Sequence, residues 1–202
     1  MDDTDAWHQY PHHRRWFDKL DLALRLGYTC GPCGVLPPSE GFYVVRPIYN
    51  LSGMGVGARQ QWLNTHDFSQ VEPGYFWNEW FSGPQHSVTY QWNDEWKPIS
   101  SWRGYNSPTN LSRFHYWRRS TFTPEPPSIV DELSDVGVIN IEYIGANPIE
   151  VHLRPSPDPD EGDEIVPVWE GDEIPSSGFI PSFDDADGFL PVPRLGFIVR
   201  NS

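Results

Sequence analysis

Two glutamates in a short stretch of alternating polar and apolar residues could hold a divalent metal ion. The runs on either side of Gly145-Ala146-Asn147 alternate with the period of two that is typical of β-strands, and the glycine favours a turn between them. A three-residue turn would place Glu142 directly opposite Glu150. Carboxylates are ligands that Mg²⁺ prefers, together with phosphate oxygens. The pattern therefore predicts a hairpin, residues 139–154, with a paired acidic site.

The same alternation assigns the other side chains of this hairpin to two faces. Asn140 is predicted to lie opposite His152, on the polar face shared by Glu142, Glu150 and Arg154. The opposite face is predicted to enter the core through Ile139, Ile141, Tyr143, Val151 and Leu153. Two facing carboxylates destabilise a sheet unless a cation lies between them. A solvated polar face with an exposed Glu–Arg pair explains the alternation equally well, so alternation alone leaves both interpretations open.

The net charge of the chain restricts its partners. Fourteen basic residues against 28 acidic residues give a formal charge of −14, which would repel a phosphate backbone. We therefore expect no nucleic-acid partner. A nucleotide is also an anion, so a nucleotide site in this chain requires local cations, backbone N–H groups and a divalent metal.

No stretch of the sequence approaches the roughly 20 apolar residues that span a bilayer. The N-terminal residues Met1-Asp2-Asp3-Thr4-Asp5 are acidic, where a signal peptide would be basic and then apolar. We therefore expect a cytoplasmic protein without a membrane partner.

Hydrophobic periodicity predicts the elements around the hairpin. Helical spacing is predicted for 16–26 and 128–134, and strands are predicted for 42–49 and 86–92. Residues 75–81 are aromatic and expected to be buried, and a final apolar run covers 195–199. Residues 93–127 show no period. The sequence predicts one domain over 1–155, with a hinge near 76–83, and an acidic, loop-rich segment over 156–202 that packs on it.

The hairpin resembles the metal-binding end of ATP-grasp enzymes. That family carries an acidic residue in one strand and Glu-x-Asn-x-Arg in the next, which Glu142 and Glu150-Val151-His152-Leu153-Arg154 match except that His152 stands at the Asn position. The resemblance implies that Glu142 and Glu150 hold Mg²⁺ on the ATP phosphates and that Arg154 contacts the reacting carboxylate. Because imidazole is a poor magnesium ligand, it also implies an altered metal site or another catalytic role for His152.

Segments upstream of the hairpin follow the order of the family's phosphate-binding parts. Phe17-Asp18-Lys19, which opens a helix ending at Gly27, resembles the start of the nucleotide-binding subdomain, and Lys19 would reach the phosphates. Arg46 in Tyr43–Pro47 takes the place of a second phosphate-binding lysine. The loop 52–58, with Ser52, Gly53, Gly55 and Gly57, resembles the family's glycine-rich loop that covers the phosphates with backbone N–H groups.

Residues 78–88 resemble the hinge of the family, which binds adenine and ribose. The resemblance places Glu79 and Phe81 in the hinge and makes His86 the candidate for the ribose. It extends over about Asp18–Pro155, and the usual N-terminal domain of the family is missing.

The resemblance implies an α+β, ATP-grasp-like fold in which two small antiparallel-sheet subdomains with helices clasp a nucleotide. The implied function is an ATP- and Mg²⁺-dependent ligase that joins a small-molecule or peptide carboxylate to an amine or thiol through an acylphosphate. Two alternatives remain open: a non-catalytic nucleotide-binding or protein-interaction module of this fold, and a protein that interacts through its acidic C-terminal segment.

Two further motifs are interpreted as structural. Cys30-Gly31-Pro32-Cys33 has the spelling of a thioredoxin site but follows a helix and runs into a Gly- and Pro-rich stretch, so two ordinary thiols in a turn are expected. The acidic run 158–164 has Gly162 at the fifth position of a calcium loop and is expected to be solvated.

Overall fold

The structure of the protein is a computed structural model that describes residues 1–106, 111, 113–186, 188 and 190–201. Its helical elements are α1 (Asp3–Gln9), the 3-10 helix η1 (Pro11–Phe17), α2 (Lys19–Arg25) and the 3-10 helix η2 (Ser128–Leu133). Its strands are β1 (Cys30–Pro32), β2 (Gly41–Pro47), β3 (Arg59–Leu63), β4 (Tyr75–Glu79), β5 (Gln85–Trp92), β6 (Trp96–Asn106), β7 (Phe114–Arg119), β8 (Val138–Ile144), β9 (Asn147–His152), β10 (Glu164–Trp169), β11 (Phe179–Asp184) and β12 (Arg194–Arg200).

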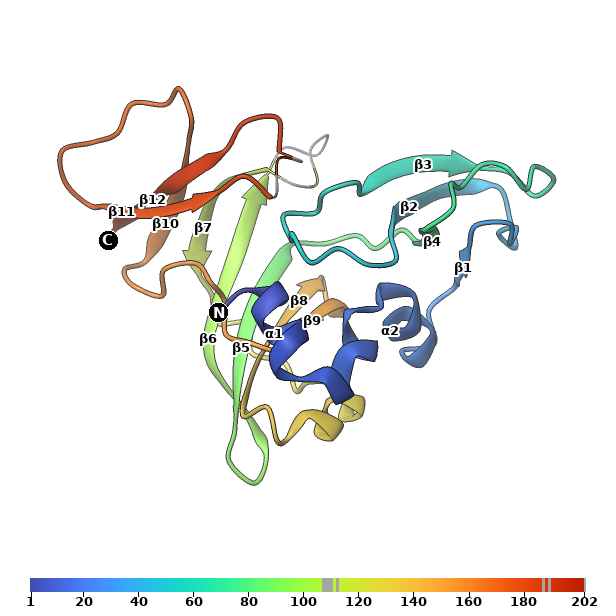
Figure 1. The fold of residues 1–202 in the computed structure, drawn as a ribbon, viewed down its shortest axis with the longest axis horizontal. Helices are drawn as coiled ribbons and strands as arrows, with labels where there is room; N and C mark the ends of the chain where they lie inside the picture. The colour runs from blue at the N-terminus through green and yellow to red at the C-terminus, as the bar shows by residue number, and fades with distance from the viewer. Residues whose placement is uncertain (107–110, 112, 187, 189, 202) are drawn as a thin grey trace.

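The strands form two sheets, and in the described residues every strand pairing is antiparallel. The smaller sheet has the order β1-β4-β2-β3, and the larger has the order β11-β12-β10-β7-β6-β5-β8-β9. In Figure 1 the two sheets lie on opposite sides of the molecule, with the N-terminal helices below and between them. The predicted α+β class with two antiparallel sheets is confirmed.

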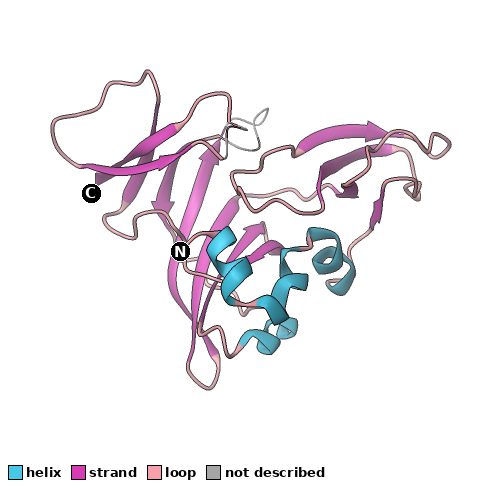
Figure 2. Cartoon of the chain, in the orientation of Figure 1, coloured by secondary structure: helices cyan, strands magenta, loops and turns pink. Residues whose placement is uncertain are grey.

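The helices gather in one group beside the β8–β9 hairpin (Figure 2). Asp2 caps α1 and Asp18 caps α2, each by accepting a backbone hydrogen bond from the residue three positions on. Because β9 is the edge strand of the larger sheet, η1 and α2 cover an edge whose backbone groups would otherwise face solvent. Among the helices of the described residues, none is long and apolar enough to cross a bilayer.

The main core lies between the helices and strands β5, β8 and β9. All five side chains that the alternation assigned to the core are buried in it, namely Ile139, Ile141, Tyr143, Val151 and Leu153. Smaller clusters fill the four-stranded sheet, through Tyr43, Val45, Leu63, Val71 and Trp77, and the β6–β7–β10–β12 region, through Trp102, Trp117, Ile165 and Phe197.

The register of the hairpin agrees with the sequence prediction at both functional pairs. Glu142 pairs with Glu150, and Asn140 pairs with His152. The predicted three-residue turn is wrong, because Ile144 pairs with Asn147 and only two residues remain between them. A bulge next to Glu142 absorbs the extra residue, so the pairing beyond it keeps the expected register.

The C-terminal segment differs most from expectation. Residues 164–200 contribute β10, β11 and β12 to the larger sheet instead of forming a loop-rich acidic tail. Strand β12 carries the predicted final apolar run at its centre. The segment therefore forms one end of the sheet, shown in red and orange in Figure 1.

Gly83 joins the two sheets at a point where no side chain fits. Its φ is +134°, and a Cβ there would lie 2.9 Å from the Cα of Gly145 in the hairpin turn. We expect Gly83→Ala to lower the free energy of unfolding by about 2–4 kcal/mol, because it adds a backbone clash to an unfavourable φ. Urea denaturation measures this. The control, Gly34→Ala, also has a positive φ but has space for a Cβ, and should cost about 1–2 kcal/mol; equal losses would contradict the clash.

Candidate functional site

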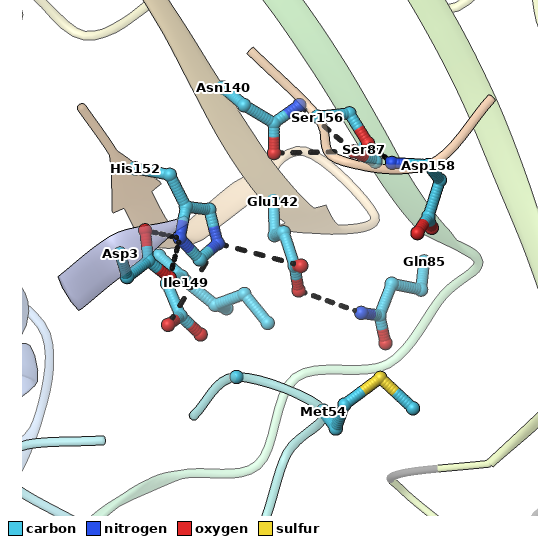
Figure 3. A network of polar contacts seen from close by, with 12 residues as sticks. Asp3, Met54, Gln85, Ser87, Asn140, Glu142, Ile149, His152, Ser156 and Asp158 are labelled. Atoms are coloured by element: carbon cyan, nitrogen blue, oxygen red, sulfur yellow. Dashed lines mark hydrogen bonds and ion pairs between the residues drawn. The ribbon is translucent and has the colours of Figure 1, made fainter. Parts of the chain in front are cut away.

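A cavity of about 470 Å³ lies between the two sheets. Both sheets line it: Val44 and Arg46 come from β2, Gln85 and Ser87 from β5, and Glu142 from β8. Further walls come from Lys19 at the start of α2, from the loop between β2 and β3, and from strands β9 to β12. Segments that are far apart in the sequence thus meet around one space, which Figure 3 shows in part.

The paired glutamates face this cavity but are held by neighbours. The Gln85 amide donates to Glu142 Oε2 at 3.0 Å, and the Lys19 ammonium lies 2.7 Å from Glu150 Oε1. Burial would raise the pKa of Glu150, but Lys19 and His152 outweigh it and hold that pKa below its usual range. Both acids are adjacent, as predicted, and Glu150 is ionised at neutral pH.

His152 lies between Glu142 and a third acid, Asp3 (Figure 3). Its Nδ1 donates to Asp3 Oδ2 at 2.9 Å, while its Nε2 is 3.7 Å from Glu142 and 3.9 Å from Glu150. Burial lowers the pKa of His152, but the Asp3 carboxylate outweighs this and raises it to about 9. The imidazole therefore carries a positive charge at neutral pH and partly neutralises the two glutamates.

Asp3 also holds Arg154. The Arg154 Nη2 donates to Asp3 Oδ2 at 2.8 Å, and its Nε lies 2.8 Å from Oδ1. Both side chains are at least nine-tenths buried. Burial would raise the pKa of Asp3, but His152 and Arg154 hold it well below its usual range. Arg154, which the resemblance assigned to the substrate, lines the cavity with part of its charge already neutralised by Asp3.

Two buried cations, Lys19 and Arg46, enter the cavity from different elements. Lys19 is the first residue of α2, and Arg46 lies near the end of β2. Arg46 donates from Nη1 to the Ile149 carbonyl at 3.1 Å and lies over the Phe76 ring. Burial lowers the pKa of Arg46, and the carboxylates of Glu150 and Glu142 oppose this. Within the described residues its Nε has no hydrogen-bond partner, which leaves a donor for an anion.

The loop between β2 and β3 covers one side of the cavity. Ser52, Gly53 and Gly55 line the cavity, as does Met54, whose φ of 55° is rare for a residue with a side chain. Asn50 holds the loop by donating to the Gly53 carbonyl at 2.9 Å and accepting from the Ser52 N–H at 3.0 Å. The positive φ angles of the glycines turn the backbone so that it can approach a ligand closely.

Comparison with known proteins gives a structural match without a sequence match. No family model and no curated protein matches the chain. A solved structure from Archaeoglobus fulgidus, provisionally described as an ATP-grasp superfamily protein, matches 93% of this chain with a TM-score of 0.51 and 13% identity. The chain has an ATP-grasp-like fold.

The chain spans 65% of the length of that archaeal protein. Two further similar structures are an L-amino acid ligase from Bacillus licheniformis and a carboxyaminoimidazole ribonucleotide synthase from Aspergillus clavatus in complex with ATP. The match to the L-amino acid ligase covers 70% of this chain and 41% of the ligase chain, with 13% identity and a TM-score of 0.48. The match to the synthase covers 77% of this chain and 52% of the synthase chain, with 9% identity and a TM-score of 0.46.

Of the three residues predicted for the hinge and the ribose, one lies at the cavity and two lie elsewhere. Residues 80–84 connect β4 of one sheet to β5 of the other, and Phe81 lines the cavity. Glu79 points away and accepts a hydrogen bond from the Thr29 N–H. His86 lies on the opposite face of β5 from Gln85 and Ser87, stacked on Phe122 at 4.2 Å. Alternation along β5 thus turns His86 away from the cavity, and Glu79 also lies outside the cavity lining.

Gly57, which the sequence placed with the other loop residues over the phosphates, also lies outside the cavity lining. It belongs to the loop but does not line the cavity, because it packs against Pro47 and the hydroxyl of Tyr75. A Cβ at this position would lie 2.9 Å from both. Its positive φ of 79° lets the loop return to β3, and of the predicted loop residues Ser52, Gly53 and Gly55 line the cavity.

A second polar group in the cavity is not indicated by the sequence. Arg194 of β12 is buried and lies 3.5 Å from both Asp158 and Asp184. Burial raises the pKa of Asp158, and Arg194 opposes this. Asp3 is not indicated either, since in the sequence it is one of several acids in an exposed-looking N-terminal run. The contacts of Arg194 with Asp158 and of Asp3 with Arg154 join distant parts of the chain, so no local spacing indicates them.

Proposed function

We propose that the chain binds a magnesium–nucleotide complex in the cavity between its sheets. The observation that carries the proposal is the convergence of two cations and two carboxylates in one cavity. Lys19 and Arg46 supply positive charge for phosphates, and Glu142 and Glu150 supply oxygen ligands for Mg²⁺. In an acidic chain of this charge, two buried cations beside two acids match what a metal-bound anion requires.

The donor set fits the nucleotide and fits the metal with one exception. The Arg46 Nε is a buried donor without a partner in the described residues, and the loop residues Ser52, Gly53 and Gly55 present backbone to the same space. Glu142 and Glu150 are hard oxygen ligands of the kind that Mg²⁺ takes. The exception is the charged His152 near both glutamates, which repels a cation.

The chemistry that this arrangement supports best is ATP-dependent ligation. Bound Mg–ATP would supply a γ-phosphoryl group, which passes to the oxygen of a carboxylate substrate as ADP leaves; an amine or thiol then attacks the carbonyl carbon and phosphate leaves. The chain would contribute positioning and charge neutralisation rather than a nucleophile. Lys19 and Arg46 would hold phosphates, Phe81 would contact the base, and Arg154 would orient the carboxylate beside Asp3.

A non-catalytic nucleotide-binding module is the second candidate. It is favoured by the ion pairs that already engage Lys19 with Glu150 and Arg154 with Asp3. The two candidates differ in turnover. Incubation with Mg–ATP and pooled carboxylates and amines should release ADP if the chain is a ligase, and only when both substrate pools are present. Nucleotide binding without ADP release in any pool would establish the module instead.

His152 provides a prediction about the metal. We expect His152→Asn to lower the Mg²⁺ concentration needed for half-maximal nucleotide binding by about tenfold, because it removes a positive charge within 4 Å of both glutamates. A magnesium titration of nucleotide binding by intrinsic tryptophan fluorescence measures this, since Trp80, Trp102 and Trp169 line the cavity. The control, His66→Ala, changes an exposed histidine. An unchanged or increased magnesium requirement for His152→Asn would contradict the proposed ligand pair.

A further inference from the structure

Two histidines and an aspartate converge on the surface, away from the cavity. His12 and His13 are consecutive residues of η1, and Asp135 follows η2. The His12 Nε2 is 3.0 Å from one carboxylate oxygen of Asp135, and the His13 Nε2 is 2.8 Å from the other. All three ligand atoms lie within 4.8 Å of one another. Within the described ranges these three side chains form a group whose ligand atoms are close enough together to hold a metal ion.

The convergence of two adjacent histidines is not a consequence of helix geometry. A 3-10 helix has 3.0 residues per turn, so successive side chains leave it about 120° apart. The imidazoles of His12 and His13 nevertheless turn toward each other, with ring centroids 4.2 Å apart and a 46° angle between the planes. Their two hydrogen bonds hold the pKa of Asp135 below its usual range, so this carboxylate is ionised at neutral pH.

We propose that His12, His13 and Asp135 form a binding site for a divalent transition-metal ion, with Zn²⁺ as the best-matched ion. Two imidazole nitrogens and one carboxylate oxygen are ligands that zinc accepts, and imidazole disfavours Mg²⁺ and Ca²⁺. Ligands bound at about 2.0–2.1 Å in a tetrahedron are roughly 3.3 Å apart. Each histidine Nε2 lies within a few tenths of an ångström of this separation from a different oxygen of Asp135, and the three ligand atoms lie within 4.8 Å of one another. Rotation of the exposed His12 and Asp135 side chains would bring the three ligand atoms to the ion.

The accessibility of the three side chains supports a site that water completes. His12 and Asp135 are more than half exposed, whereas the side chain of His13 is 12% exposed. Exposed ion pairs of this kind stabilise a protein by only about 0–1 kcal/mol. A metal ion would replace two weak hydrogen bonds with three ligand bonds and would leave its remaining position to solvent. The net charge of −14 also favours accumulation of divalent cations near the surface.

The position of the site gives it a structural role. It joins η1 to the short segment between η2 and β8. The helix η1 lies between α1, which carries Asp3, and α2, which begins with Lys19, while β8 carries Glu142. A metal at this surface would therefore fasten the N-terminal segment to the strand that supports one wall of the cavity, without contacting the nucleotide site itself.

The experiment is a zinc titration by isothermal calorimetry on the full chain after removal of metals. It is done in a Cys30→Ser/Cys33→Ser background, so that thiolates contribute no site, and in excess Mg²⁺, so that Glu142 and Glu150 are occupied or masked. The variants are His12→Ala and Asp135→Asn, both at exposed side chains, so their folding is not at risk. The control is His66→Ala, another exposed histidine near a carboxylate, Glu40.

We expect one equivalent of Zn²⁺ to bind the background chain and the His66→Ala control with equal affinity. The affinity should fall by about tenfold or more in His12→Ala and in Asp135→Asn. Substitution with Co²⁺ should give visible absorption without the near-ultraviolet band of a thiolate ligand. Absence of zinc binding by the background chain would overturn the proposal, as would binding that neither His12→Ala nor Asp135→Asn weakens.

Discussion

Replacing Asp3 by alanine is expected to lower the free energy of unfolding by about 3–5 kcal/mol. The Asp3 carboxylate is 3% exposed in side-chain area and contacts both Arg154 and His152 within 3 Å. Its removal leaves a guanidinium and an imidazolium close together in the protein interior without their shared counter-ion. A buried charge without its partner costs far more than a surface ion pair contributes. Urea denaturation followed by tryptophan fluorescence measures the loss.

The matched control for Asp3 is Asp5, which belongs to the same helix. Asp5 is exposed, and its carboxylate accepts the Asp2 N–H in the capping box of α1. We expect Asp5→Ala to cost about 1 kcal/mol or less. Asp3→Asn should behave like Asp3→Ala, because it keeps the shape and removes the charge. Similar stabilities of Asp3→Ala and Asp5→Ala would show that Asp3 does not hold the cluster together.

Replacing Lys19 by methionine is expected to weaken the binding of Mg–nucleotide by about 10–100-fold. The Lys19 ammonium lies at the cavity wall, 7% exposed and 2.7 Å from Glu150, where it can bind a phosphate oxygen as well. A charge-assisted hydrogen bond of this kind contributes about 1.5–3 kcal/mol. Titration with a non-hydrolysable ATP analogue, monitored by tryptophan fluorescence, gives the affinity.

Lys97→Met is the control for Lys19→Met, because it removes the same charge from an exposed lysine paired with Glu95. Any effect of net charge on anion binding is therefore shared by the two variants. Since Lys19→Met also leaves Glu150 without its closest cation, Lys19→Arg is measured beside it and should retain most of the affinity. If Lys19→Met bound the analogue as tightly as Lys97→Met does, Lys19 would not contact the phosphates.

The hairpin could be predicted from the sequence because two independent constraints agree there. Alternation fixed the faces, and the small number of residues between the runs limited the register. The turn was predicted with one residue too many, yet the bulge beside Glu142 left the Glu142–Glu150 pair intact. The helix start at Lys19 was similarly specified, since Asp18 provides the N-cap.

Strands β6 and β7 could not be predicted because both of their faces carry large aromatic side chains. Trp102 and Trp117 are buried in one cluster, whereas Tyr105 and Tyr116 stack on each other at 4.6 Å. A strand with aromatic residues on both faces shows no period of two in hydrophobicity. Both strands lie within residues 93–127, where the sequence shows no hydrophobic period.

Strand β10 could not be predicted because it contains Pro167, and a proline ordinarily argues against a central strand. The structure shows why it is tolerated. Pro167 pairs with Phe197 of β12 on one side, whereas the pairing of β10 with β7 includes only Glu164 and Ile165. Because the pairing with β7 does not reach Pro167, its missing N–H removes no hydrogen bond between β10 and β7.

The candidate site was predictable only in the parts that local patterns encode. The cavity brings together four of the residues that the resemblance indicated, namely Lys19, Arg46, Glu142 and Glu150. Each of them stands in a short segment whose residue order resembles that of the family. The Asp3 contact with Arg154 joins residues 151 positions apart in the sequence, so a single sequence cannot indicate it. His86 was misplaced for the opposite reason: its neighbours fit the hinge pattern, but the strand parity of β5 turns it to the other face.

The measurement that tests the central proposal most directly is calorimetry with Mg²⁺ and a non-hydrolysable ATP analogue. It compares the wild-type chain, Glu150→Gln, and the control Glu173→Gln, whose side chain is exposed. We predict that the wild type and Glu173→Gln bind the analogue only with magnesium present, and that Glu150→Gln binds it about tenfold more weakly or worse. Absence of binding by the wild type, or equal binding by Glu150→Gln, would contradict a magnesium–nucleotide site at the hairpin.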